Sequence, residues 1–252
     1  MMEPIQKEIT ELLLESTKTE KPAKYKDLKK YIGTNYDFAG LSVPTQRAIF
    51  KNGFSFSALP LAKQLEIWDE LWKTSNHYDI MTFALMFVNR HLKTFEPVEI
   101  WNITMEWVRK VDNWAHSDSL STIYADLLEI EPDLIYNHYG TWNKSVNPWE
   151  RRQSLVGLLN YSKMRAKVLP FEKLSSMTLV LLEDEDYFVQ KAVGWTLREM
   201  GNVYLGETLA LLADNIAIIH PTAFTAAIEK LSVANKEQLK LLRKIARKKS
   251  SV

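Results

Sequence analysis

Apolar residues along this chain recur at steps of three and four positions, and strict alternation of apolar and polar residues is rare. The clearest example is the stripe formed by Phe188, Ala192, Trp195 and Met200. Such steps place apolar side chains on one face of a helix, whereas a half-buried strand needs alternation. The residue choice agrees, because Leu, Lys, Glu, Ala and Met are plentiful and only 8 glycines occur. The pattern therefore predicts an all-α protein.

Proline and polar residues mark where these helices should begin. Proline is tolerated in a first helical turn, because its missing N–H would have no partner there anyway. The prolines at such positions are Pro44, Pro97, Pro132, Pro148 and Pro221. Asn147 precedes one of them and is a typical N-cap residue. We expect twelve to fourteen helices joined by short loops.

Four of the expected helix starts form a weak internal repeat. Each has an aromatic residue shortly after a polar capping residue, and these aromatic residues are Tyr78, Trp114, Trp149 and Phe188. Successive members are 36, 35 and 39 residues apart. An all-helical period near 40 residues is typical of HEAT and armadillo arrays. The spacing predicts a HEAT-like helical repeat solenoid whose second helices line a concave groove. The alternative is a non-repeating helical bundle in which the spacing is coincidental.

Composition bounds the remaining possibilities. We expect the 252 residues to form a single repeat domain, 1–252, that ends in a basic tail from about residue 236 to 252. The absence of cysteine excludes disulfides, cysteine-ligated metals and a cysteine nucleophile. No apolar run is long enough to span a bilayer, and the N-terminus lacks the layout of a signal peptide. We therefore expect a cytoplasmic protein that makes no membrane contact.

The net charge of +1 requires any basic surface to be one face, balanced by acidic faces elsewhere. The end of the chain is locally basic, with Lys236, Lys240, Arg243, Lys244, Arg247, Lys248 and Lys249 against Glu237. Such a cluster can equally be the solvated face of a last helix.

Three helix starts carry candidate binding or catalytic residues. Trp114 and Asp118 are four apart, so they share one helix face. Basic residues follow at two later starts, and these are Arg151, Arg152, Lys191 and Arg198, with Trp195 at helical spacing between the last two. Cations suit phosphate, flat rings suit sugars or bases, and a carboxylate suits a positively charged centre. The set therefore favours a groove that binds DNA.

Each of these residues also has a purely structural interpretation. The tryptophans Trp114, Trp149 and Trp195 can belong to the core between repeats. Asp118 can be a solvated helix residue, and Arg152 can pair with Glu150 or with an acid on a neighbouring repeat. His116 has no metal-binding partner at ligand spacing, so we interpret it as structural. The sequence holds no nucleotide-binding loop, dinucleotide fingerprint or nucleophile elbow.

Three motifs resemble the AlkD-type family of DNA alkylation repair enzymes. They are Trp114-x-x-x-Asp118-Ser, Trp149-x-x-Arg152, and Phe188-Val-Gln-Lys191-Ala-Val-Gly194-Trp195-x-Leu-Arg198-Glu199. The segment from Tyr31 through Phe38-Ala-Gly40 to Pro44-Thr-Gln-Arg47 is similar to the family's N-terminal pattern. Together the motifs cover most of the chain from Tyr31 to Gly201. The string Gln-Lys-Ala-x-Gly-Trp-x-Leu-Arg-Glu is the most specific of them.

The resemblance implies a HEAT-like fold and the excision of cationic alkylated purines, such as 3-methyladenine and 7-methylguanine, from duplex DNA. It implies that Asp118 is the catalytic carboxylate and that Trp114 and Trp195 flank the deoxyribose of the lesion. Further residues expected to contact DNA are Arg152, Arg151, Tyr31, Trp149, Phe188, Lys191 and Arg198. We expect no metal or other cofactor, and a monomer.

One position departs from the family pattern. An acidic residue often follows the tryptophan that matches Trp114, whereas this chain has Ala115 and then His116. The matching carboxylate, Asp118, is kept. Two alternatives to a glycosylase therefore stay open: a protein that binds damaged or branched DNA without catalysis, and a scaffold for protein interactions.

Overall fold

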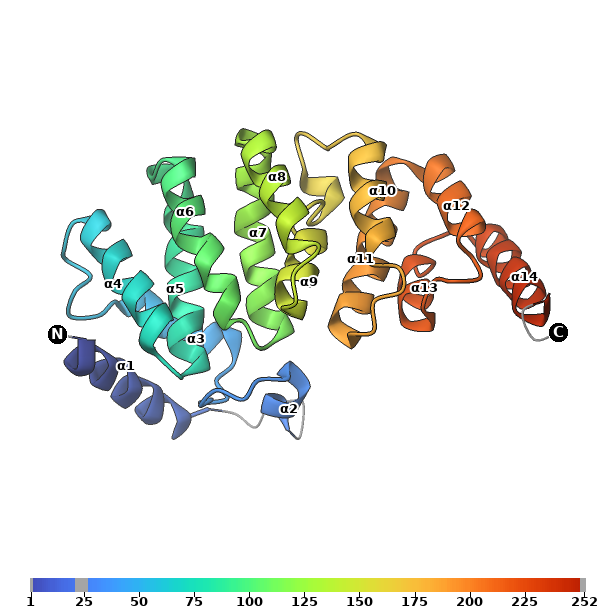
Figure 1. Ribbon diagram of the computed structural model, residues 1–252. Coiled ribbons are helices and arrows are strands. Elements are labelled where there is room, and N and C mark those ends of the chain that lie inside the picture. Colours follow the sequence, from blue (N-terminus) through green and yellow to red (C-terminus); the bar gives the residue numbers. More distant parts are fainter. Residues whose placement is uncertain (1, 21–26, 250–252) are drawn as a thin grey trace. The chain divides into compact units, whose positions relative to one another are not determined.

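The computed structural model describes residues 2–20 and 27–249, and helices dominate this part of the chain (Figure 1). Among these residues no strand forms, and the β-type pairing is an isolated bridge between Asp37 and His77. The expectation of an all-α protein is therefore confirmed. Fourteen α-helices are present in the described ranges, which agrees with the expected number.

The chain divides into two compact units, Met1–Ile123 and Tyr124–Val252, and the division falls within helix α7. The first unit holds α1 (Met2–Thr17), α2 (Leu28–Ile32), α3 (Val43–Asn52), α4 (Leu61–Thr74), α5 (Tyr78–His91), α6 (Pro97–Trp107) and the start of α7 (Trp114–Ile130). The second holds α8 (Pro132–Trp142), α9 (Pro148–Val156), α10 (Phe171–Val180), α11 (Tyr187–Val203), α12 (Leu205–Asp214), α13 (Pro221–Ala227) and α14 (Val233–Lys249). Short 3-10 turns occur at η1 (Leu92–Thr94), η2 (Val108–Lys110) and η3 (Ser162–Met164). The expectation of a single domain stays a prediction.

The helices follow one another as pairs, α4/α5, α6/α7, α8/α9, α10/α11 and α12/α13, and the two members of a pair start differently. Every second helix has an N-cap side chain that accepts a backbone N–H, and these caps are His77, Asn113, Asn147, Asp186 and His220. No first helix has such a cap bond. Four first helices instead have proline as N-cap or first residue, namely Pro60, Pro97, Pro132 and Pro170. The repeated starts expected at 78, 114, 149 and 188 are thus confirmed to within one residue.

Packing within each unit follows this alternation. In the first unit the first helix α4 contacts the next first helix, α6, as well as its own partner α5. In the second unit the second helices α9, α11 and α13 contact one another in succession. Helices that pair locally and then stack on their equivalents form the two layers of a repeat array.

The tryptophans fall into two groups by the exposure of their side chains. Trp68, Trp72, Trp101, Trp107 and Trp142 are at most 4% exposed. The remaining three tryptophans, Trp114, Trp149 and Trp195, are only partly buried. The three tryptophans that the sequence motifs single out are thus less deeply buried than the five tryptophans of the core.

Helices α11 and α13 approach each other closely at Gly194. A Cβ atom added at this glycine would lie 2.5 Å from the carbonyl oxygen of Ala223 and 2.8 Å from the Cβ of Ala226. Real Cβ atoms do not approach backbone so closely, so a larger residue would push the two helices apart. Gly194 thus explains one position of the most specific motif by packing alone.

We predict that Gly194→Ala lowers the free energy of unfolding by roughly 1–3 kcal/mol, because overpacking displaces α13. Gly206→Ala is the matched control, since a Cβ there meets nothing within 4 Å and alanine favours the helix. Urea unfolding followed by circular dichroism measures both changes. Equal effects of the two substitutions would contradict the packing explanation.

Candidate nucleic-acid interface

Tyr31, Trp114 and Asp118 meet in the first unit. The indole N–H of Trp114 donates to the backbone oxygen of Tyr31 at 3.0 Å, and the two rings pack edge to face at 5.5 Å. Asp118 lies one turn further along α7 and is exposed, as is Tyr31. The contact fixes the orientation of the Trp114 ring while part of the ring remains accessible. These three candidate residues therefore form one surface with an oriented indole and a carboxylate.

A carboxylate before α7 holds the chain segment that carries Tyr31. Asp112 accepts hydrogen bonds from the hydroxyl of Thr34 at 2.9 Å and from the backbone N–H of Asn35 at 2.7 Å. Tyr36 donates to the backbone oxygen of Lys110 at 2.5 Å. The loop after α2 is thereby tied to the turn from which α7 starts. Tyr31 is thus held beside Trp114 by bonds on its C-terminal side.

His116 is buried beneath this surface and is neutral. Its Nδ1 accepts from the side-chain amide of Asn113 at 3.0 Å, so Nε2 carries the proton and donates to the Thr82 hydroxyl at 3.1 Å. The ring stacks on Tyr78 with centroids 4.3 Å apart. Burial lowers the pKa of His116 to about 4. His116 therefore joins the starts of α5 and α7, as its expected structural role requires.

A second buried carboxylate, Asp79, holds the next part of the N-terminal motif. It accepts from the backbone N–H of Ala39 at 2.9 Å and from the side-chain amide of Gln46 at 2.8 Å. Burial raises the pKa of Asp79, and these hydrogen bonds oppose the rise. Gly40 follows with φ of +75°, a conformation that side chains with a Cβ rarely adopt. The Phe38-Ala-Gly motif is thus explained by docking of its backbone on α5.

Aromatic rings gather at the starts of α9 and α11 in the second unit. Trp149 and Phe188 have ring centroids 5.0 Å apart, and Phe188 packs edge to face on the exposed Tyr187 at 5.3 Å. Both helices are capped just before these rings, by Asn147 and Asp186. The two predicted aromatic residues are therefore brought together, and Tyr187 extends their surface.

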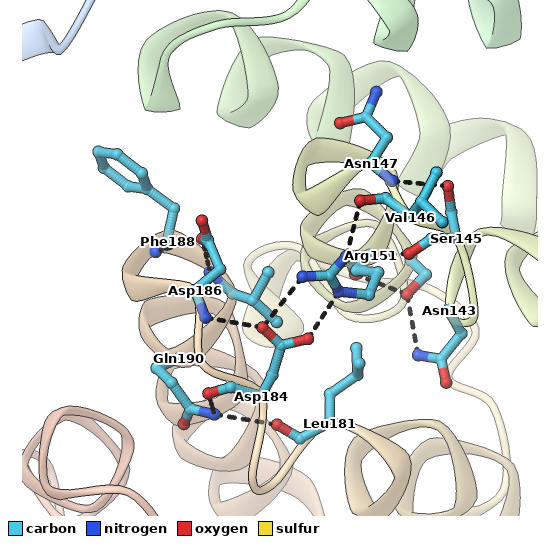
Figure 2. A network of polar contacts seen from close by, with 12 residues as sticks. Asn143, Ser145, Val146, Asn147, Arg151, Leu181, Asp184, Asp186, Phe188 and Gln190 are labelled. Atoms are coloured by element: carbon cyan, nitrogen blue, oxygen red, sulfur yellow. Dashed lines mark hydrogen bonds and ion pairs between the residues drawn. The ribbon is translucent and has the colours of Figure 1, made fainter.

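Arg151 has a structural role in the loops before α9 and α11 (Figure 2). Its Nε donates to Asp184 Oδ2 at 2.6 Å, and its Nη2 donates to Asp184 Oδ1 at 3.2 Å. Its Nη1 donates to the backbone oxygens of Ser145 and Val146 at 2.9 and 3.1 Å. Every nitrogen of the guanidinium therefore has a partner within the chain, and the expected contact of Arg151 with DNA stays a prediction.

Arg152 lies on a different side of α9 and is only 6% exposed. Its Nη1 donates to the backbone oxygen of Phe188 at 2.8 Å, which joins α9 to the first turn of α11. Arg152 can therefore offer a phosphate no more than an edge of its guanidinium.

Lys191, Trp195 and Arg198 lie on one face of α11, as their spacing predicts. Lys191 is exposed, whereas Arg198 donates to Glu229 at 2.7 Å and lies 5.9 Å from the Trp195 ring. Trp195 is partly buried and has an ion-paired arginine beside it. Of the two cations, Lys191 is the more accessible to a ligand.

The sequence motifs did not single out Tyr161, whose ring packs edge to face on Trp195 at 6.1 Å. Tyr161 is 59% exposed and has φ of +49°, which is strained for a residue with a Cβ. The next residue, Ser162, donates from its N–H at 2.8 Å and its hydroxyl at 2.6 Å to the buried Glu199 carboxylate. No sequence signal pointed to this contact, since the two residues that form it lie 37 positions apart.

The described residues offer neither a metal site nor a helix that could span a membrane. Within 2–20 and 27–249 no three His, Asp or Glu side chains gather as a group able to hold a metal ion. Over the same residues, none of the helices combines the length and the apolar character that crossing a membrane requires.

The paired helices and their capped second members define a helical repeat protein. Residues 12–231 match the family of DNA alkylation repair enzymes, and the chain belongs to this family. The resemblance seen in the sequence motifs is thereby confirmed, and the family is one of DNA repair enzymes. Residues that bind DNA are expected of such a family.

Two solved structures share the fold. A predicted DNA alkylation repair enzyme from Enterococcus faecalis is 17% identical with a TM-score of 0.71, over 85% of this chain and 97% of its own. AlkD2 from Streptococcus mutans is 16% identical with a TM-score of 0.50, over 92% and 97%. The comparison with curated proteins finds no match. The helical repeat fold is therefore shown, and the non-repeating bundle is set aside.

We predict that the first unit loses stability in acid because His116 is held neutral. The unfolded chain, with an ordinary histidine pKa near about 6.5, binds a proton that the folded protein accepts only near pH 4. The contribution of His116 to the free energy of unfolding is therefore complete above about pH 6.5. It falls by roughly 2–4 kcal/mol as the pH drops to about 4. Unfolding free energies of wild type and His116→Gln across this range measure it. Parallel curves for the two proteins would contradict the assignment.

We predict that Asp184→Asn lowers the free energy of unfolding by roughly 1–3 kcal/mol, because a largely buried guanidinium loses its counter-charge. The side chains of Arg151 and Asp184 are only 19% and 8% exposed. Glu66→Gln is the control, since its ion pair with Lys63 is more than half exposed and contributes little. A thermal or urea unfolding series shows whether the two losses differ.

Proposed function

We propose that the protein is a DNA glycosylase that excises positively charged alkylated purines, such as 3-methyladenine and 7-methylguanine, from duplex DNA. The observation that carries the proposal is the exposed carboxylate of Asp118 one helical turn after the oriented, partly accessible indole of Trp114. Membership of the DNA alkylation repair enzyme family supports it. The motif residues Trp114 and Asp118 are those to which the resemblance assigns the chemistry.

The proposed reaction replaces the N-glycosidic bond by a bond to water. An N-alkylated purine is already cationic, so it leaves as a neutral base with the bonding electron pair and needs no general acid. The departing base leaves positive charge on the sugar ring, at C1′ and the ring oxygen. The Asp118 carboxylate stabilises this charge and orients the attacking water, whose oxygen bonds to C1′ while its proton is lost to solvent.

The aromatic residues can stabilise the same positive charge on the sugar. The faces of tryptophan rings attract cations by about 0.5–2 kcal/mol each. Trp114 is oriented by Tyr31, and Trp195 is flanked by Tyr161, so both rings keep a defined direction. We assign both tryptophans to the deoxyribose and backbone around the lesion. The attraction of ring faces for cations favours cationic lesions over neutral ones.

The remaining residues are assigned to DNA binding. Lys191 supplies an exposed charge for phosphate, and the resemblance assigns Arg152 to a phosphate near the lesion. Trp149 and Phe188 present rings at the starts of α9 and α11, where they can pack against sugars. Arg198 acts beside Trp195, held by Glu229. A monomer suffices for this function, because one chain carries all of these residues.

We predict that Asp118→Asn abolishes base release but keeps DNA affinity, because the amide retains the size of the carboxylate and loses its charge. Release of methylated purines from an alkylated duplex measures activity, and fluorescence anisotropy with the same duplex measures affinity. Asp133→Asn is the control, since this aspartate is also exposed but lies on α8. The control is expected to release bases as wild type does.

The other outcomes separate the alternatives. Release by both wild type and Asp118→Asn would keep the glycosylase but assign its catalytic group elsewhere. DNA binding without release by wild type would indicate a protein that recognises damaged or branched DNA. Negligible DNA affinity even at low salt would indicate a scaffold for protein interactions, because phosphate contacts strengthen as salt is removed.

A further inference from the structure

Helix α14 borders a basic hollow of about 570 Å³ in the second unit. Five basic residues and one aromatic residue line it, namely Lys240, Arg243, Lys244, Arg247, Lys248 and Phe224. No carboxylate is among these lining residues. The chain as a whole carries a net charge of only +1, so the hollow concentrates positive charge that is balanced elsewhere.

The basic residues share a face of α14 because they follow one another at steps of three and four. Lysine pairs at this spacing repel one another, as do arginine pairs, and each such pair costs about 0.2–0.5 kcal/mol. The ordinary interpretation is a solvated last helix whose cations favour its C-terminus. That interpretation accounts for Arg247 and Lys248. Lys240 forms an ion pair with Glu237 at 2.9 Å, but both side chains are more than half exposed, so solvent screens the pair and leaves the lysine able to bind another anion.

Arg243 is the rigid part of the hollow. It is only 7% exposed, and it donates to the backbone oxygens of Ile216 at 3.3 Å and Ile219 at 2.6 Å. Its guanidinium carbon lies 4.4 Å from the centre of the Phe224 ring. Burial, with the charge of Arg247 as a smaller cause, lowers the pKa of Arg243. The protein therefore keeps a fixed, partly desolvated cation at the base of a group of exposed lysines.

We propose that this hollow binds phosphates of the DNA backbone. Lys240, Lys244 and Lys248 are exposed and recur every four residues on the helix, so their ammonium groups follow a line. A line of cations beside a fixed arginine suits a polymer of phosphates better than a single anion. The inference rests on the proposed DNA substrate, but it does not depend on base release.

An anionic membrane is the competing partner for a basic helix. A helix that lies on a membrane places its apolar residues in the bilayer, with lysines at the flanks. The exposed apolar residues Leu241 and Ile245 lie on a face of α14 that does not line the hollow. The concave basic surface therefore favours the nucleic-acid backbone, and the membrane becomes an outcome of the test.

The experiment compares wild type with Lys240→Gln/Lys244→Gln/Lys248→Gln, which leaves Arg243 in place. Affinity for an unmodified duplex is measured by anisotropy over a series of salt concentrations. The slope of log affinity against log salt is expected to fall by about 2–3, since each lost phosphate contact removes about 0.9. Affinity at low salt is expected to fall about tenfold or more. Lys7→Gln/Lys63→Gln/Lys93→Gln removes the same charge from exposed positions in the first unit and should change the slope little.

Three further readouts decide between the outcomes. Base release at saturating enzyme should stay normal in the α14 variant, whereas it is lost in Asp118→Asn, so failure of the hollow and failure of the glycosylase are distinguishable. Equal slope changes in both triple variants, or no change in either, would overturn the inference. So would binding of pyrophosphate, or of vesicles rich in phosphatidylserine, that needs these lysines when duplex binding does not.

Discussion

The structure depends on how the first backbone N–H groups of each second helix are satisfied. A helix start leaves these donors without intrahelical partners, and a short turn between packed helices gives water little access to them. Polar side chains in the turns therefore accept them, at His77, Asn113, Asn147 and Asp186. Once the turn is fixed by its cap, the direction of the residues just after it is fixed too. The capped starts therefore orient the aromatic residues of the candidate interface.

The helix starts and their caps could be predicted from the sequence, because each depends on residues close together in the chain. A cap acts within three residues and a proline start within one, so both leave a readable pattern. The spacing of Tyr78, Trp114, Trp149 and Phe188 followed from the same pattern, and it predicted the helical repeat. The partial exposure of Trp114 could not be read locally, because it depends on Tyr31, which is 83 residues away along the chain.

The contacts that could not be predicted are those between distant segments. Arg151 and Arg152 are neighbours in sequence, yet helical geometry turns them about 100° apart, so they meet different partners. Arg151 finds Asp184 and two backbone oxygens, whereas Arg152 finds the oxygen of Phe188. The partner that each of two adjacent arginines finds thus depends on a segment more than thirty residues later. Tyr161 is a similar case, since its neighbour Ser162 is held by the distant residues Glu199 and Asn202.

In both units, carboxylates bind chain segments that lie next to the candidate residues. In the first, the carboxylates Asp79 and Asp112 bind backbone N–H groups of the N-terminal segment, and this places Tyr31 beside Trp114. In the second, the carboxylates Asp184 and Glu199 hold loops that flank Trp149 and Trp195. Each of these carboxylates has its oxygens committed to partners within the fold. Asp118 differs from them in exposure: it lies at the surface one helical turn after an oriented indole, and on this we base the proposal that it acts on a ligand.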